Sequence, residues 1–144
     1  MAVEQNYSNH VRWYPLAHFV VGPLLLLNII WQGVRLYQEP SWNQAEAVVF
    51  AVTVIMLSVA ARLQALKAQD RVIRLEEQLR FNRLLSPEVA AKAANLDIEK
   101  LIALRFASDV ELPELLDAVL EKRLHSSKEI KTAIKAWRGD YLRV

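Results

Sequence analysis

Two long apolar segments, separated only by a short polar link, most constrain what this chain can fold into. They run over residues 14–37 and 44–66, and the link between them is residues 38–43. As a helix, the first segment extends about 36 Å, which exceeds the roughly 30 Å hydrocarbon core of a bilayer. Because the link is short and contains the helix breaker Pro40, the segments are predicted to form an antiparallel hairpin of two transmembrane helices.

The rest of the chain has a different composition. Apolar residues make up 53% of the sequence but are concentrated between Trp13 and Leu66, whereas the region from Lys67 onward carries most of the charge. A soluble domain repeats its apolar residues periodically along its whole length, so this division is typical of a membrane protein. Three glycines and five prolines leave little material for β-turns, and we predict an all-α fold.

The positive charges predict the orientation in the membrane. Arginines and lysines follow the second segment closely, beginning with Arg62 and Lys67, while the link has none and Arg35 lies just inside the first segment. The positive-inside rule therefore places both termini in the cytoplasm, and residues 1–13 become a cytoplasmic N-terminal segment. The first segment is too long for a cleaved signal peptide, and a second apolar segment follows it directly.

Polar side chains in the first segment follow a helical spacing and share one face. Because polar groups that face lipid are unfavourable, we expect this face to contact the second helix or a partner chain. Alternatively, several copies of the chain form a pore lined by this face. A further alternative is a haem ligated by His18 from two copies of the chain, but one histidine per span is a poor signal for haem. The residues of this intramembrane seam are His18, Asn28, Gln32 and Arg35.

The second helix is predicted to continue past the membrane as an amphipathic stalk over residues 67–85, because no helix breaker intervenes. Apolar residues repeat along it at alternating intervals of three and four, the spacing of a coiled-coil seam. Such a seam contacts either another copy of the chain or the chain's own C-terminal region, and both interpretations stay open. The stalk seam consists of Ala65, Ala68, Val72, Leu75 and Leu79.

Residues 86–144 are predicted to form a small cytoplasmic bundle of four short helices, the last ending near Gly139. Capping residues and prolines mark the helix starts at Ser86-Pro87, Asp97, Pro113 and the Ser126–Glu129 capping box. The last helix has a basic face, which would bind anionic lipid headgroups if the helix lies on a bilayer. The simpler interpretation is that its apolar stripe packs into the bundle and the basic residues are solvated. The basic face is Lys128, Lys131, Lys135 and Arg138.

The sequence contains no recognisable catalytic or cofactor motif. The absence of cysteine excludes thiolate chemistry, and three isolated glycines cannot form a phosphate-binding loop. His10, His18 and His125 do not have the spacing of metal ligands. A net charge of +2 is too small to favour nucleic acid. We therefore expect no enzyme activity, no cofactor, no metal and no small-molecule substrate, and no particular lipid, quinone, haem or pigment is indicated.

Four segments spread over nearly the whole chain resemble an uncharacterised family of small two-span bacterial membrane proteins. The resemblance implies a bacterial inner-membrane location. It transfers no activity and no functional residue, because that family is itself a domain of unknown function. The segments are NHVRW (Asn9 to Trp13), QDRVIRLEEQLR (Gln69 to Arg80), ALRFASDVELPEL (Ala103 to Leu115) and IKTAIKAWRGDYLRV (Ile130 to Val144).

Together these features lead to a hypothesis of a non-catalytic membrane component. It is either an accessory subunit of a larger membrane complex or a homo-oligomeric scaffold, and its partners are membrane lipids and other subunits or copies of itself. The alternatives are an oligomeric pore or transporter-like assembly and a sensor of anionic lipid.

Overall fold

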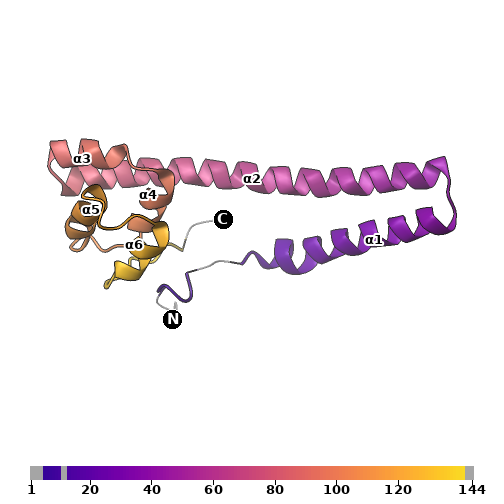
Figure 1. Ribbon diagram of the computed structural model, residues 1–144, viewed down its shortest axis with the longest axis horizontal. Coiled ribbons are helices and arrows are strands. Elements are labelled where there is room, and N and C mark those ends of the chain that lie inside the picture. The colour runs from indigo at the N-terminus through magenta and orange to yellow at the C-terminus, as the bar shows by residue number, and fades with distance from the viewer. Residues whose placement is uncertain (1–4, 11–12, 142–144) are drawn as a thin grey trace. The chain divides into compact units, whose positions relative to one another are not determined.

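The computed structural model describes residues 5–10 and 13–141 (Figure 1). Among these residues every regular element is a helix, and the one pairing of β type is an isolated antiparallel bridge between Ala107 and Trp137. The prediction of an all-α fold is therefore confirmed. In chain order the elements are the π-helix η1 (Leu16–Val21), α1 (Gly22–Gln38), α2 (Trp42–Leu84), α3 (Pro87–Ala94), α4 (Ile98–Leu104), α5 (Leu112–Leu120) and α6 (Ser127–Ala133).

The chain divides into two compact units. One comprises Arg12–Leu66, and the other comprises Met1–Val11 together with Lys67–Val144. Two helical stretches are long and apolar enough to span a membrane, judged by length and composition alone. These are Leu16–Gln38, with a mean hydropathy of 1.6, and Trp42–Leu84, with a mean hydropathy of 2.0.

In the first unit, the helix changes its winding where η1 meets α1. The N–H of Gly22 donates to the carbonyl of Ala17, five residues back, as in a π-helix. Pro23 follows and has no N–H to continue the ordinary ladder, so a widened turn here accommodates the missing donor. A Cβ on Gly22 would lie only 3.2 Å from the Ala17 oxygen, which explains a glycine at this turn.

A hydrogen bond between amide side chains joins the helices of the first unit, and small residues of α2 are buried or partly buried. Gln44 of α2 donates a hydrogen bond of 2.8 Å from Nε2 to Oε1 of Gln32 in α1. Ala51 is only 5% exposed, and Ala47 and Ser58, on the same side of α2, are partly buried. Small residues at a helix face permit close approach of a neighbouring helix, so this side of α2 is suited to packing within the chain.

In the second unit, the last turns of α2 pack with α3 to α6 around one apolar core. Its largest fully buried side chains are Phe81, Leu101, Leu104, Phe106, Leu112, Leu116 and Ile130. Phe81 belongs to α2, so this helix supplies part of the core and is not merely a connection. The helix ends at Leu84, within one residue of the predicted end of the stalk.

The short helices begin where the capping signals predicted. α3 begins at Pro87, and Asp97 is the N-cap of α4. At the start of α6, the hydroxyl of Ser126 accepts the N–H of Glu129 at 3.2 Å, and the Glu129 carboxylate accepts the N–H of His125 at 2.8 Å. This backbone hydrogen bond from His125 is the main cause that lowers the pKa of Glu129.

The last helix is shorter than the sequence predicted. It ends at Ala133, and the next residue, Ile134, has extended backbone with φ −68° and ψ 123°. The segment that follows pairs with the chain after α4: the N–H of Ser108 donates to Ala136, and the N–H of Arg138 donates to Phe106. The prediction that this helix reaches Gly139 was therefore wrong, because these long-range backbone bonds replace the helical ones.

Candidate functional site

In the second unit, α2 has two faces of different character. One face is buried by the chain's own C-terminal helices and includes Ile73, Glu77 and Phe81. The other bears the predicted stalk seam. In the structure its largest residues are exposed: Val72 by 53%, Leu75 by 62% and Leu79 by 72%. Ala68 is also exposed and Ala65 is partly buried. The C-terminal helices thus occupy the opposite face and leave the three large residues of the seam uncovered.

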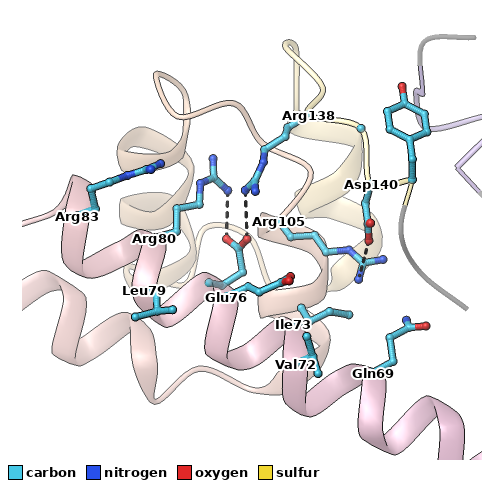
Figure 2. Close-up of a pocket in the computed structure, with 13 residues that line it drawn as sticks. Gln69, Val72, Ile73, Glu76, Leu79, Arg80, Arg83, Arg105, Arg138 and Asp140 are labelled. Carbon is cyan, nitrogen blue, oxygen red and sulfur yellow. Dashed lines mark hydrogen bonds and ion pairs between the residues drawn. The ribbon is translucent and has the colours of Figure 1, made fainter. Parts of the chain in front are cut away.

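A charge cluster is centred on the packed face of α2 (Figure 2). At its centre is Glu77, which is 3% exposed. Its Oε2 lies 3.1 Å from Nη1 of Arg80, and its Oε1 lies 3.3 Å from Nη1 of Arg138. Glu77 therefore binds one arginine of its own helix and one from the C-terminal segment.

Arg80 extends the cluster to the loop before α5. Its Nε donates to Oδ1 of Asp109 at 2.8 Å, and its Nη2 donates to the carbonyl of Ala107 at 2.7 Å. Arg83 binds the other oxygen of Asp109 at 3.1 Å. A second buried arginine, Arg105, lies 3.3 Å from Asp140 and over the ring of Phe106. Each guanidinium is paired with a carboxylate, but the four arginines share three carboxylates, so the pairing offsets most of the positive charge and not all of it.

The carboxylates of this cluster differ in their pKa. Burial raises the pKa of Glu77, and the nearby Arg80 and Arg138 offset this only in part. The hydrogen bond from Arg80 lowers the pKa of Asp109, with further attraction from Arg83 and Arg138. Glu77 thus favours its protonated form more than an ordinary glutamate does.

An open pocket of about 650 Å³ lies between α2 and the segment after α6. Its polar wall is formed by the arginines of the cluster, and its apolar wall includes two residues of the stalk seam. Among the described residues, no group of three or more His, Asp or Glu side chains is arranged to hold a metal. The seam residues and the arginines of the charge cluster that line the pocket are Val72, Leu79, Arg80, Arg83, Arg105 and Arg138.

The structure places the predicted intramembrane seam only partly at a helix contact. Gln32 is partly buried and accepts the hydrogen bond from Gln44, whereas Asn28 is exposed on the surface of this unit. His18 is also exposed, with Nδ1 2.9 Å from the carbonyl of Tyr14. Arg35 is exposed and lies 3.8 Å from Glu39. Contacts of the three exposed side chains with a partner remain a prediction.

The predicted basic face is divided between different environments. Lys128 is exposed on α6, while Lys131 is partly buried with Nζ 5.7 Å from the centre of the Phe106 ring. Lys135 and Arg138 follow the end of the helix, and Arg138 pairs with Glu77. The apolar stripe of this region packs inward, since Ile130 and Ile134 are buried. The four basic residues therefore do not share one helical face.

The N-terminal segment contributes contacts that no sequence pattern indicated. The amide of Gln5 donates to the carbonyl of Asp140 at 3.1 Å and accepts the N–H of the same residue at 2.8 Å. The ring of His10 lies 5.8 Å from the rings of both Phe106 and Trp137. The segment is too short and polar for a periodicity, so only its packing in the second unit identifies it as part of that unit.

Over its whole length, residues 1–144, the chain matches a family described as "Family of unknown function (DUF6526)". The chain belongs to this family. The resemblance to an uncharacterised family, drawn from four segments, is thereby confirmed. Membership of DUF6526 assigns no activity and no functional residue to the chain. No curated protein and no solved structure matches it.

Proposed function

We propose that this DUF6526 chain is a non-catalytic integral-membrane protein that acts by binding other protein chains, as an accessory subunit of a membrane complex or as a homo-oligomeric scaffold. The observation that carries the proposal is the exposed apolar stripe on α2. Three large apolar side chains on one face of the helix are exposed, although the opposite face is packed. They are Val72, Leu75 and Leu79. A contiguous apolar stripe of this kind is typical of a surface that binds a partner.

The exposure of apolar side chains on the two candidate spans supports a membrane location. Of the most apolar stretch of each candidate span, only 0% and 6% of the residues are buried within the chain. A core helix of a soluble protein buries its apolar residues, whereas a lipid-facing helix leaves them on the outside. In the arrangement that we propose, α1 and the first part of α2 form an antiparallel hairpin in a bacterial inner membrane.

The orientation follows from the charges that flank this hairpin. The link, residues 39–41, contains no lysine or arginine, and the chain after the second span is rich in both. By the positive-inside rule, the C-terminal helices and the N-terminal segment then lie in the cytoplasm. The stalk seam would be presented at the cytoplasmic surface of the membrane.

The charge cluster supports a structural role and not a catalytic one. Its buried members Glu77 and Arg80 are each held by two or more hydrogen bonds or ion pairs within the chain. A buried ion pair whose partners are satisfied fixes local geometry. Here it fixes the C-terminal helices on one face of α2, so that the other face stays available.

Native mass spectrometry of the protein extracted gently from its own membranes tests this function. We expect heteromeric masses or multiples of the 16.5 kDa chain mass. A Leu75→Gln/Leu79→Gln variant should lose the partner, since it replaces two exposed apolar residues by polar ones. A Lys128→Gln variant, changed at an exposed residue of α6, is the matched control and should retain it. A lone monomer for the parent protein would contradict the proposal.

A further inference from the structure

The exposed stripe on α2 has the composition and charge pattern of a two-stranded coiled coil. We infer that it binds a second copy of this chain, with the two α2 helices parallel and in register. This inference rests on the proposed membrane function and names the partner of the same surface.

α2 is divided between two faces in a way that matches a heptad repeat. With Val72 and Leu79 at heptad position a and Leu75 at position d, the residues that pack on the chain's own core fall at the outer positions. Ile73, Glu77 and Phe81 take positions b, f and c. In a two-stranded coiled coil, a and d face the partner helix while b, c and f point away from it. A second α2 helix therefore fits on the seam without displacing the C-terminal helices.

The apolar residues of the seam also resemble those of a two-stranded coiled coil. Val72 is β-branched and occupies position a, and Leu75 occupies position d. β-Branched residues at a with leucine at d favour two strands over three or four. The next a position is taken by Leu79, which is not β-branched, so this preference comes from Val72 and Leu75. Ala68, at the preceding d position, is small and allows the two helices to approach closely where they leave the apolar segment.

The charged residues that flank the seam are complementary in a parallel pair of helices. In a parallel pair, position g of one helix lies beside position e of the next heptad on the other helix. Arg71 occupies g and Glu76 occupies e, so Arg71 would lie beside Glu76 of the partner subunit, and the pair would occur twice by symmetry. Both side chains are exposed, and no ion pair among the described residues involves either of them.

The membrane provides both the orientation and the concentration that a short seam needs. Two copies inserted by the same positive-inside rule have the same orientation, so their α2 helices run parallel. A seam of about two heptads is marginal for free helices in water. Anchoring both copies in one bilayer raises their effective concentration, and a weak contact then suffices.

Cysteine cross-linking in membranes tests the inference, since the chain contains no native cysteine. Leu75→Cys in the full-length protein should give a disulfide-linked dimer on mild oxidation, and Val72→Cys should do the same. Lys67→Cys, exposed at an outer position of the same helix, is the matched control. We expect the dimer fraction at the seam positions to exceed the control severalfold. Equal cross-linking at all three positions, or none at the seam, would overturn the inference.

A charge-reversal experiment tests the parallel register. Arg71→Glu alone and Glu76→Arg alone should each lower the dimer fraction of Leu75→Cys several-fold, because like charges then face each other across the seam. Mixing differently tagged copies of these two variants should restore dimers, and these should be heterodimers. Failure of the mixture to restore them excludes the register.

The two proposals fail separately. Heteromeric masses in native mass spectrometry without seam cross-links would overturn the second copy as partner while leaving the accessory-subunit function standing. A lone monomer without cross-links would overturn both.

Discussion

Arg138 and Glu77 are 61 residues apart in the sequence, yet Nη1 of the arginine lies 3.3 Å from Oε1 of the buried carboxylate. This ion pair joins the extended segment after α6 to α2. It lies on the face of α2 opposite the exposed seam, so it belongs to the contacts that fix which face of the helix stays uncovered.

Replacement of Glu77 by glutamine should reveal how its carboxyl group titrates. Because burial raises the pKa of Glu77, the folded protein binds this proton more tightly than the unfolded chain does. Its contribution to the free energy of unfolding is therefore complete below pH 4.5, the ordinary glutamate pKa, and is lost as the pH rises through the raised value. Thermal unfolding of the parent and of Glu77→Gln in detergent, from about pH 4 to about pH 8, measures this. The stability advantage of the parent should shrink as the pH rises, and an advantage that grows would contradict the assignment.

Alanine substitutions at two nearby positions on α2 should differ greatly in their effect on the free energy of unfolding. Phe81 is fully buried in the core, and Phe81→Ala should lower the free energy of unfolding by about 3–5 kcal/mol. Leu79 is 72% exposed, and Leu79→Ala should change the stability of the single chain by less than about 0.5 kcal/mol. Denaturant titration measures both changes, at protein concentrations where the chain is monomeric. If Leu79→Ala destabilises the monomer as much as Phe81→Ala does, the seam is not a free surface.

Much of the helical framework of this chain is predictable from its residues. Ser86-Pro87 and Asp97 are residue types typical of helix starts, a preference that depends only on nearby residues. The structure has helices there, although neither the Ser86 nor the Asp97 side chain makes a cap hydrogen bond. The end of α6 is not predictable in this way. Its basic and apolar residues continue to Arg138 with helical spacing, but backbone bonds to Phe106 and Ser108 end the helix at Ala133.

The candidate site could be predicted only in part from the sequence, again because long-range contacts decide the rest. The spacing of Val72, Leu75 and Leu79 identifies a seam but not what covers it. The deciding fact is that Glu77 and Phe81 are buried instead, which depends on contacts with residues far along the chain such as Arg138. Glu77 itself has the appearance of an ordinary surface residue of a charged helix, and no sequence signal distinguishes it from Glu76.

Lys122 should be a site where a single substitution stabilises the chain. It has a positive φ of 59° just after α5, where the N–H of Arg123 donates to the carbonyl of Ala118. This is the left-handed helix cap that favours glycine, because a Cβ is strained there. Lys122→Gly should raise the free energy of unfolding by about 0.5–1 kcal/mol in denaturant titration. Lys122→Ala, which keeps the Cβ, is the control and should give no such gain.

Asn28 should distinguish a lipid-facing or packed helix from a pore. It is exposed on the surface of the first unit, near the middle of the first apolar stretch. In the proposed function it faces lipid or a partner chain, so Asn28→Cys in membranes should not react with a water-soluble maleimide. Ser41→Cys, in the link between the helices, is the control and should react. Rapid labelling of Asn28→Cys would favour a water-filled pore lined by this helix.

The most direct test of the account is the position of α2 across the bilayer, since the seam can bind a second copy as proposed only if both copies are inserted in the same orientation. Single cysteines at Ser41 and Lys67 can be labelled in intact and in permeabilised cells with a maleimide that does not cross the inner membrane. We expect Ser41→Cys to be labelled in intact cells and Lys67→Cys to be labelled only after permeabilisation. Labelling of both positions in intact cells, or of neither, would contradict it.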